Sequence, residues 1–380
     1  MRVLVTGGAG FIGSFLAEQL LARGDRVVLF DNLDHQVHPD GVPAYLPPQA
    51  ELHTGDIRNR TELAPLVDAA DVIVHCAAAV GVAQSVYRPN HYMDVNVRGT
   101  ALLLELIAER KNPLQKLIIP TSMTSYGEGL YRRLSDGKSI RVDVRTSEDI
   151  QRYGWEPVCP ETGKPVEPIP TAETSESKAR NTYALSKRYQ EELALSLGNT
   201  HGFPVVCLRL FNVYSPRQSM SNPYTGVLAI FLSRLLAGQP PVVYEDGRQT
   251  RDFISVHDVV DAILLAIESS DVNGNVVNIG SGIARPIADC TRKLAGLLGR
   301  SDIEPDITTQ FRKGDIRHCT ADIYRAGRLM GFIPKVKWDD GLTELIEWAT
   351  AAPFADRSSQ ATDELRRYRL IANIETGAST

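Results

Sequence analysis

Short apolar runs alternate with helix-like stretches through the first half of the chain. The apolar runs are rich in Val, Leu and Ile and lack a strict apolar–polar alternation, which is the pattern of strands buried on both faces. We expect such strands at 2–6, 26–30, 71–76, 114–120 and 204–210. Between them, helical spacing is found in 13–23, 61–69, 91–110 and 181–197. This alternation predicts a parallel sheet with right-handed crossovers.

The pattern loosens after residue 211. Helical runs at 227–237 and 256–269 are separated by a Gly- and Pro-rich connection, and a short strand follows at 276–279. The predicted fold class is therefore α/β. A Rossmann-type doubly wound parallel sheet would cover 1–206, and a smaller mixed α/β C-terminal domain would cover 207–350, with some segments returning to the first domain.

Two polar segments break the rhythm. The stretch 128–172 is a long insert rich in Pro, Arg and Glu. An insert of this length is usually functional or has small structure of its own. The end of the chain, 351–380, is a polar tail that we expect to fray.

Charge and composition narrow the possible partners. The 41 Lys and Arg against 46 Asp and Glu give a net charge of −5, which argues against nucleic acid. No run approaches the roughly 18 apolar residues of a membrane-spanning helix, and the chain opens as a strand rather than as a signal peptide. The five cysteines are widely spaced without a C-x-x-C pair, so we expect no disulfide framework and a cytoplasmic, reducing compartment.

The histidines give no metal motif. His35 and His38 stand three residues apart, but no carboxylate pattern accompanies them, so we interpret both as solvated loop residues. We therefore expect no metal site.

A glycine-rich turn joins the first strand to the first helix. It runs from Thr6 to Gly13, and such a turn lets the backbone approach a pyrophosphate at a helix N-terminus. The turn could also be purely structural. However, the second strand leads into Asp31, and a carboxylate there accepts hydrogen bonds from an adenosine ribose and repels a 2′-phosphate. The pattern therefore predicts NAD rather than NADP.

A tyrosine and a lysine lie four residues apart on one predicted helix. Tyr183 and Lys187 would share a helix face, where a nearby cation lowers the pKa of a phenol. An exposed surface pair is the alternative. Ser122 follows the strand at 114–120, at the sheet edge where ligands bind in open α/β folds. Together these residues predict a site for hydride transfer.

At this point the chain resembles the extended short-chain dehydrogenase/reductase family, in its nucleotide-sugar epimerase/dehydratase branch. The resemblance covers about residues 1–350. The segments that carry it are 6–13, 55–58, 75–78, 209–214, 251–254 and 312–315, together with Ser122, Tyr183 and Lys187. It implies an NAD-binding domain over 1–206 and a nucleotide-sugar-binding domain over 207–350.

The resemblance also implies roles for individual residues. Tyr183 would be the base, Ser122 its hydrogen-bonding helper, and Lys187 the residue that holds the nicotinamide ribose, with Thr124 also in the catalytic group. The implied cofactor-binding residues are Gly7, Gly10, Phe11, Ile12, Gly13, Asp31, Asn32, Asp56, Ile57, Ala77, Ala78, Ala79, Asn96, Tyr183, Lys187, Phe211 and Val213. The implied substrate-binding residues are Val80, Met123, Asn212, Pro223, Tyr224, Thr225, Gly226, Val227, Arg251, Arg312 and Asp315.

The neighbours of Ser122 indicate the reaction. In the family that the chain resembles, relatives that eliminate water across C5–C6 carry a Thr-Asp-Glu sequence at this place. This chain has Met123 and Thr124 there. Neither is a practical proton donor at neutral pH, which disfavours elimination. We therefore predict an NAD-dependent 4-epimerase acting through a transient 4-keto sugar. A 4-ketosugar reductase or dehydrogenase, a dehydratase and a non-catalytic NAD-binding sensor remain alternatives.

The substrate follows from the resemblance alone. The segments 217–227 and 245–251 look like those of dTDP-L-rhamnose 4-epimerases and their close relatives, and so does the long insert. These similarities imply a nucleotide-diphosphate sugar, either dTDP-L-rhamnose-like or a UDP-sugar. They also imply a homodimer built on the helices near 91–110 and 181–197, although the apolar positions of these helices could equally belong to the core.

Overall fold

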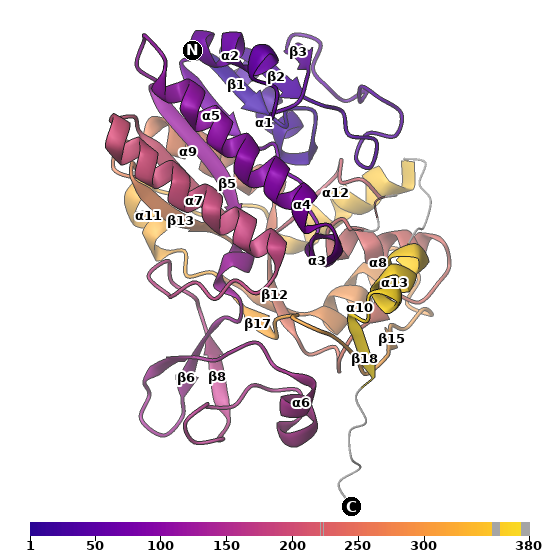
Figure 1. Ribbon diagram of the computed structural model, residues 1–380. Helices are drawn as coiled ribbons and strands as arrows, with labels where there is room; N and C mark the ends of the chain where they lie inside the picture. Colours follow the sequence, from indigo (N-terminus) through magenta and orange to yellow (C-terminus); the bar gives the residue numbers. More distant parts are fainter. Residues whose placement is uncertain (221, 223, 352–357, 374–380) are drawn as a thin grey trace, which may run out of the picture.

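A seven-stranded parallel sheet forms the centre of the computed structural model, which describes residues 1–220, 222, 224–351 and 358–373 (Figure 1). The strand order is β13-β9-β5-β4-β1-β2-β3. The strands are β1 Arg2–Thr6, β2 Arg26–Asp31, β3 Glu51–Thr54, β4 Val72–His75, β5 Lys116–Ser122, β9 Val205–Leu210 and β13 Asn275–Ile279. The order reverses beside β1, where open sheets of this kind leave a crevice for ligands. The predicted doubly wound sheet is confirmed.

Helices cover both faces of this sheet. On one face, α1 (Phe11–Ala22), α9 (Val256–Glu268) and α11 (Tyr324–Met330) bury apolar side chains against it. On the other face lie α2 (Arg60–Ala69), α5 (Gly99–Ala108) and α7 (Thr182–His201). Figure 1 shows α5 and α7 side by side across this second face. Three elements from beyond residue 207 therefore belong to the central sheet and its helical layers, namely α9, β13 and α11.

The predicted helix at 91–110 is interrupted. It consists of α4 (Pro89–Tyr92), a π-helical turn (Met93–Arg98) and then α5. Thr100 Oγ1 donates to the Asn96 carbonyl at 2.6 Å, and the buried Asn96 side chain faces the β4 loop. The periodicity of apolar residues does not predict this π-helical turn. The turn coincides with hydrogen bonds between the Asn96 side chain and residues far away in the sequence.

The smaller region has its own apolar core. Its sheet contains β10 (Asn212–Tyr214), β12 (Thr250–Ser255), β14 (Ala284–Pro286) and β17 (His318–Cys319). Its helices are α8 (Val227–Leu236), α10 (Ile287–Leu297) and α12 (Trp338–Ala351), which bury their apolar faces against one another. A short pair, β11 (Val242–Val243) and β15 (Asp306–Ile307), lies beside them.

The insert is structured and projects from the end of the sheet (Figure 1). Three strands, β6 (Leu130–Arg133), β7 (Ser139–Arg141) and β8 (Val166–Ile169), form a small antiparallel sheet. Helix α6 (Ser147–Tyr153) begins with a complete capping box from Thr146 and Asp149. The expectation that this insert has small structure of its own agrees with the fold.

The polar tail differs from the expectation of fraying. Helix α13 (Ser358–Arg367) is followed by β18 (Ile371–Asn373), which pairs antiparallel with β16 (Gln310–Arg312). Leu365 is buried, so one apolar side chain anchors an otherwise polar helix. Residues 352–357 and 374–380 of the predicted tail lie outside the described residues.

One of the two histidines that we expected in a solvated loop is buried. His38 is the buried one, whereas His35 is exposed. All five cysteines are free. Among the residues that the structure describes, no helix has the length and apolar character needed to cross a bilayer, and no group of three or more His, Cys, Asp or Glu could hold a metal ion.

Candidate active site

The glycine turn packs so closely on neighbouring backbone that two of its positions have no room for a side chain. Gly7 has a φ of 66°, and a Cβ there would lie 2.6 Å from the Ala77 nitrogen. A Cβ on Gly13 would lie 2.5 Å from the Gly7 carbonyl oxygen. Gly10 precedes the first turn of α1, which has no side-chain cap, so its N–H groups remain available for an anion. Phe11 and Ile12 begin that helix. This cradle fits a dinucleotide pyrophosphate.

Two carboxylates border the cradle. Asp31 ends β2 and is buried, with its oxygens accepting from Ala9 N at 3.0 Å and Leu33 N at 2.9 Å. Asn32 follows it, exposed. Asp56 binds the Arg58 guanidinium, and this hydrogen bond lowers the pKa of Asp56 to about 2 despite partial burial. Ile57 beside it is buried. Asp56 is therefore an ionised acceptor, and the oxygens of both carboxylates are suited to ribose and adenine donors.

One side-chain amide holds the loop after β4 in place. Asn96, fully buried, accepts from Ala79 N at 2.8 Å and donates to the Ala79 carbonyl at 3.1 Å. The same amide donates to Ser186 Oγ on α7 at 2.9 Å. The loop residues Ala77, Ala78 and Ala79 are thereby tied to the helix that carries the predicted base.

The catalytic candidates meet at the carboxyl end of β5. Ser122 is the last residue of β5, while Tyr183 and Lys187 lie one turn apart on α7, and all three are buried. Ser122 Oγ accepts from Thr124 Oγ1 at 3.0 Å, and Lys187 Nζ donates to the Pro120 carbonyl at 3.2 Å. The predicted quartet is therefore assembled between β5 and α7.

The pKa values refine the expected role of Lys187. Burial raises the pKa of Tyr183 to about 12, although a hydrogen bond with Ser122 opposes the rise. Burial also lowers the pKa of Lys187 to about 8. The protein group that opposes the rise in the pKa of Tyr183 is thus Ser122 rather than Lys187, contrary to the expectation from their spacing. A phenolate here needs a further positive charge.

Residues predicted for the substrate and for the cofactor lie together near β10. Met123, a predicted substrate residue, packs with Phe211, a predicted cofactor residue, in one buried cluster. Val213, also predicted for the cofactor, lies in β10. Asn212, at the start of β10, has a buried Oδ1 without a hydrogen-bond partner, which leaves an acceptor for a ligand. Val80 is exposed at the loop after β4.

A cluster of two arginines and one aspartate includes residues of the smaller C-terminal region. Arg251 Nη2 and the Arg312 guanidinium both bind Asp315, at 3.1 Å and 2.6 Å. The three residues come from β12, β16 and the loop that precedes β17. The structure therefore brings together three residues that the resemblance placed at the nucleotide sugar.

The loop before α8 holds the remaining predicted residues. Tyr224 and Thr225 donate their backbone N–H groups to Asn222, and Gly226 precedes Val227, the first residue of α8. Pro223 lies outside the described residues. Tyr224 also contacts residues that the sequence analysis did not identify.

Those missed residues come from distant elements. Glu364 on α13 accepts hydrogen bonds from the hydroxyls of Tyr87 and Tyr224, and the Tyr87 ring stacks on Tyr368 at 4.3 Å. Tyr92 packs edge-on against Tyr183 at 6.3 Å. No local sequence pattern predicts the contact of Glu364. The two tyrosines at 87 and 92 are a signal that could have predicted aromatic side chains beside the site.

The carboxylate of Asp31 should control the choice of dinucleotide. We expect Asp31→Asn to weaken NAD binding about tenfold, because a charge-assisted hydrogen bond to the ribose becomes neutral. The same change removes the repulsion of a 2′-phosphate, so the preference for NAD over NADP should shrink. Titration of both dinucleotides into cofactor-free protein measures the ratio of Kd values.

The exposed neighbour Asp34 provides the matched control. Asp34→Asn should leave both Kd values unchanged. An unaltered ratio of the two Kd values in Asp31→Asn would contradict this role.

Comparison with known proteins agrees with this geometry. The family model "NAD dependent epimerase/dehydratase family" matches residues 3–148 and 157–280. A dTDP-L-rhamnose 4-epimerase of Burkholderia thailandensis is 34% identical, over 91% of this chain and 94% of that protein. A UDP-N-acetyl-alpha-D-glucosaminuronate decarboxylase of Bacillus cytotoxicus is 30% identical, over 91% and 97%.

A solved structure extends the similarity to the whole fold. UDP-glucose 4-epimerase of Thermotoga maritima, with UDP-glucose, superposes with a TM-score of 0.76 at 29% identity, covering 92% of this chain and 99% of that one. The matched family model spans more than half of the chain and includes the glycine turn, Ser122, Tyr183 and Lys187. The chain is therefore an enzyme of the NAD-dependent epimerase/dehydratase family.

Proposed function

We propose that this protein is an NAD-dependent 4-epimerase of a nucleotide-activated hexose or deoxyhexose, either dTDP-L-rhamnose-like or a UDP-sugar. The observation that carries the proposal is the buried group of Ser122, Tyr183 and Lys187 beside the glycine cradle. Met123 and Thr124 follow Ser122. An elimination needs an acid and a base at these positions, and neither residue can serve as one, so the sequence favours epimerisation. The 34% identity with a dTDP-L-rhamnose 4-epimerase supports the same reaction.

The chain's own residues would hold and move one proton. Tyr183, as phenolate, takes the proton of the C4 hydroxyl, and Ser122 holds that hydroxyl by a hydrogen bond. NAD⁺ held in the cradle would supply a reversible acceptor for the C4 hydride and a positive charge that favours the phenolate. The 4-keto sugar turns over in the crevice, and Tyr183 then returns its proton to the C4 oxygen. The overall step is redox-neutral.

Lys187 would have an orienting role. Its ammonium donates to the Pro120 carbonyl and retains further donors for the nicotinamide ribose hydroxyls. Asp31, Asp56 and Ile57 would hold the adenosine end, and the cradle between Gly7 and Gly13 the pyrophosphate.

The second domain would bind the nucleotide sugar. Arg251 and Arg312 present planar guanidinium groups, which match diphosphate oxygens. Asp315 between them accepts from both and would also accept from ribose hydroxyls. The free Asn212 Oδ1 would take a donor from the sugar, and residues 224–227 would flank the base.

The assembly and location are part of the same proposal. We propose a homodimer through the outer faces of α5 and α7, where Tyr189 is an exposed aromatic side chain. We also propose a cytoplasmic location, in line with five free cysteines.

An assay without added NAD tests the reaction. Purified protein without added NAD should interconvert C4 epimers, followed by proton NMR on dTDP-, UDP- and GDP-sugars, because the hydride leaves and returns within one turnover. Conversion that requires NADH in stoichiometric amounts would instead identify a ketoreductase or dehydrogenase.

A further inference from the structure

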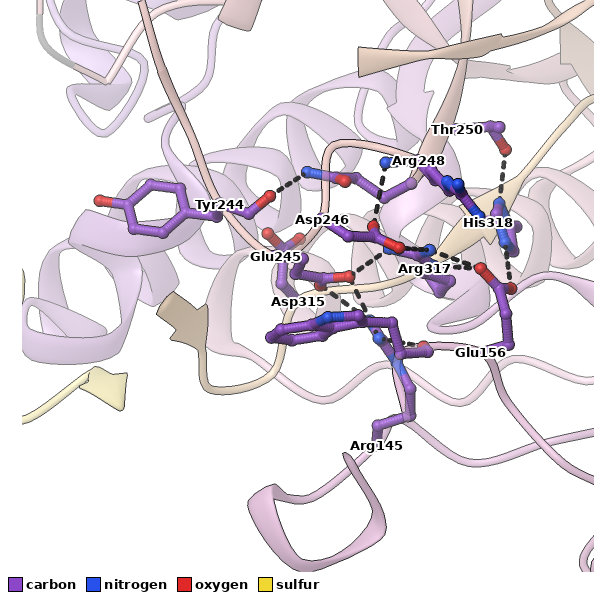
Figure 2. A network of polar contacts seen from close by, with 12 residues as sticks. Arg145, Glu156, Tyr244, Glu245, Asp246, Arg248, Thr250, Asp315, Arg317 and His318 are labelled. Atoms are coloured by element: carbon purple, nitrogen blue, oxygen red, sulfur yellow. Dashed lines mark hydrogen bonds and ion pairs between the residues drawn. The ribbon is translucent and has the colours of Figure 1, made fainter. Parts of the chain in front are cut away.

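A buried ion network joins the insert to the second domain (Figure 2). At its centre is Arg317, whose side chain is fully buried. Its guanidinium binds Glu245 at 2.7 Å, Asp246 at 2.7 Å and 3.0 Å, and Glu156 at 3.0 Å. Glu156 belongs to the insert, and the other two carboxylates to the turn between β11 and β12. Arg317 therefore joins two segments that are far apart in sequence.

A second arginine from the insert enters the same network. Arg145 binds Glu245 through both terminal nitrogens, at 3.1 Å and 2.9 Å, and both side chains are buried. Glu245 has a φ of 59°, a left-handed conformation that a glutamate rarely adopts. Such backbone persists only where its surroundings hold it, and here the two arginines hold its carboxylate.

The insert also fixes the backbone beside Arg317. Glu128, buried at the start of the insert, accepts from Arg317 N at 2.8 Å and from His318 N at 2.8 Å. The His318 ring lies between Glu156 at 2.9 Å and Thr250 at 2.8 Å. The peptide around 317 is thus held on its N–H side and through two side chains.

The opposite side of this peptide holds Arg251. The Arg317 carbonyl accepts from Arg251 Nη1 at 3.1 Å and from Thr250 N at 3.1 Å. The Ile316 carbonyl accepts from Arg251 Nη2 at 2.8 Å. The guanidinium that we assign to the diphosphate is therefore docked on two carbonyls whose position depends on the network. In Figure 2 the dashed contacts connect Glu156 to Arg317 and His318 directly.

We propose that the insert positions the diphosphate-binding Arg251 by clamping Arg317, with Glu156, Arg145 and Glu128 as positioning residues; this inference rests on the proposed function. The insert thereby sets the affinity for the nucleoside diphosphate end of the substrate and leaves the chemistry at C4 alone. The Nη1 and Nη2 hydrogens of Arg251 are taken by three backbone carbonyls and Asp315, which leaves its Nε–H for a phosphate oxygen. A shift of the 316–317 peptide would turn this donor away from the phosphate.

Calorimetric titration of dTDP and UDP into the holoenzyme tests this role. Glu156→Gln keeps the shape of a half-exposed side chain but removes its charge. We expect about three- to tenfold weaker binding of the nucleotide that the wild type binds. The KM of the sugar nucleotide should rise by the same factor, while kcat and the retained NAD stay unchanged. A purely structural role would instead also lower kcat and the amount of retained NAD.

Glu167→Gln is the matched control within the insert. Glu167 is an exposed carboxylate bound to Arg132 at 2.8 Å, outside the network, and its loss should change nothing. Glu245→Gln should give the larger effect, but because that residue is buried, Glu156→Gln decides the case if the Glu245 variant does not fold.

A double-mutant comparison asks whether the effect passes through Arg251. Glu156→Gln should weaken binding less in an Arg251→Gln background than in the wild type. Equal weakening in both backgrounds, or wild-type affinity in Glu156→Gln, would overturn the positioning role. Failure of the wild type to bind either nucleotide would instead overturn the proposed function on which this inference rests.

Discussion

Tyr183→Phe is expected to lower kcat for C4 epimerisation by about a thousandfold or more, because the base that takes the C4 hydroxyl proton is removed. The ring remains, and it packs edge-on against Tyr92, so the fold should persist. NAD should stay bound, since no contact of the glycine cradle involves the phenol. Turnover by NMR and the NAD released on heat denaturation are the two measurements.

Tyr324→Phe is the matched control for this change. Tyr324 is an exposed tyrosine at the start of α11, away from the proposed dimer faces, and its variant should turn over at the wild-type rate. Undiminished turnover in Tyr183→Phe would contradict the role of Tyr183 as the base. Loss of both NAD and activity would point to a structural role instead.

Glu191→Ala is expected to destabilise the folded protein by about 3–5 kcal/mol, the cost of leaving a buried charge without its partner. Glu191 and Arg209 are both almost fully buried and bind each other at 2.7 Å and 3.0 Å. The Arg209 guanidinium also lies over the Tyr126 ring at 4.6 Å. This pair connects α7, one turn beyond Lys187, to β9. Urea unfolding of wild type and variant gives the difference in free energy.

Two further variants check the physical cause. Glu192→Ala removes an adjacent exposed carboxylate that binds Arg188 at 2.7 Å and should change stability by less than about 1 kcal/mol. Combining Glu191→Leu with Arg209→Met removes both charges and should recover much of the loss. A change near zero in Glu191→Ala would contradict the assignment of an uncompensated buried charge.

The parts of the fold that repeat a local pattern could be predicted from sequence. Strands β1, β2, β4, β5 and β9 fall within a few residues of their predicted ranges, because buried parallel strands are continuous apolar runs. The cradle at Gly7 and Gly13 follows from residue type, since a Cβ at either position would meet backbone. The positions of Ser122, Tyr183 and Lys187 at one edge follow from the topology of the sheet.

Other features depend on partners far away in sequence. Arg145 meets Glu245 across 100 residues and Arg317 meets Glu156 across 161, and no periodicity reports such pairs. The docking of α13 on Tyr87 and Tyr224 is invisible for the same reason. The pKa of Tyr183 was also expected to respond to Lys187 because of their spacing, whereas burial raises it. Spacing alone does not report desolvation.

The most direct test of the account follows the hydrogen at C4. A nucleotide sugar carrying deuterium at C4, with dTDP-L-rhamnose and UDP-glucose as the two probes, is incubated with the purified protein without added cofactor. Mass spectrometry and NMR then locate the label in the product. If Tyr183 works against a retained NAD, the C4 epimer forms and keeps its deuterium at C4. Deuterium found at C6, or lost to solvent, would contradict the account.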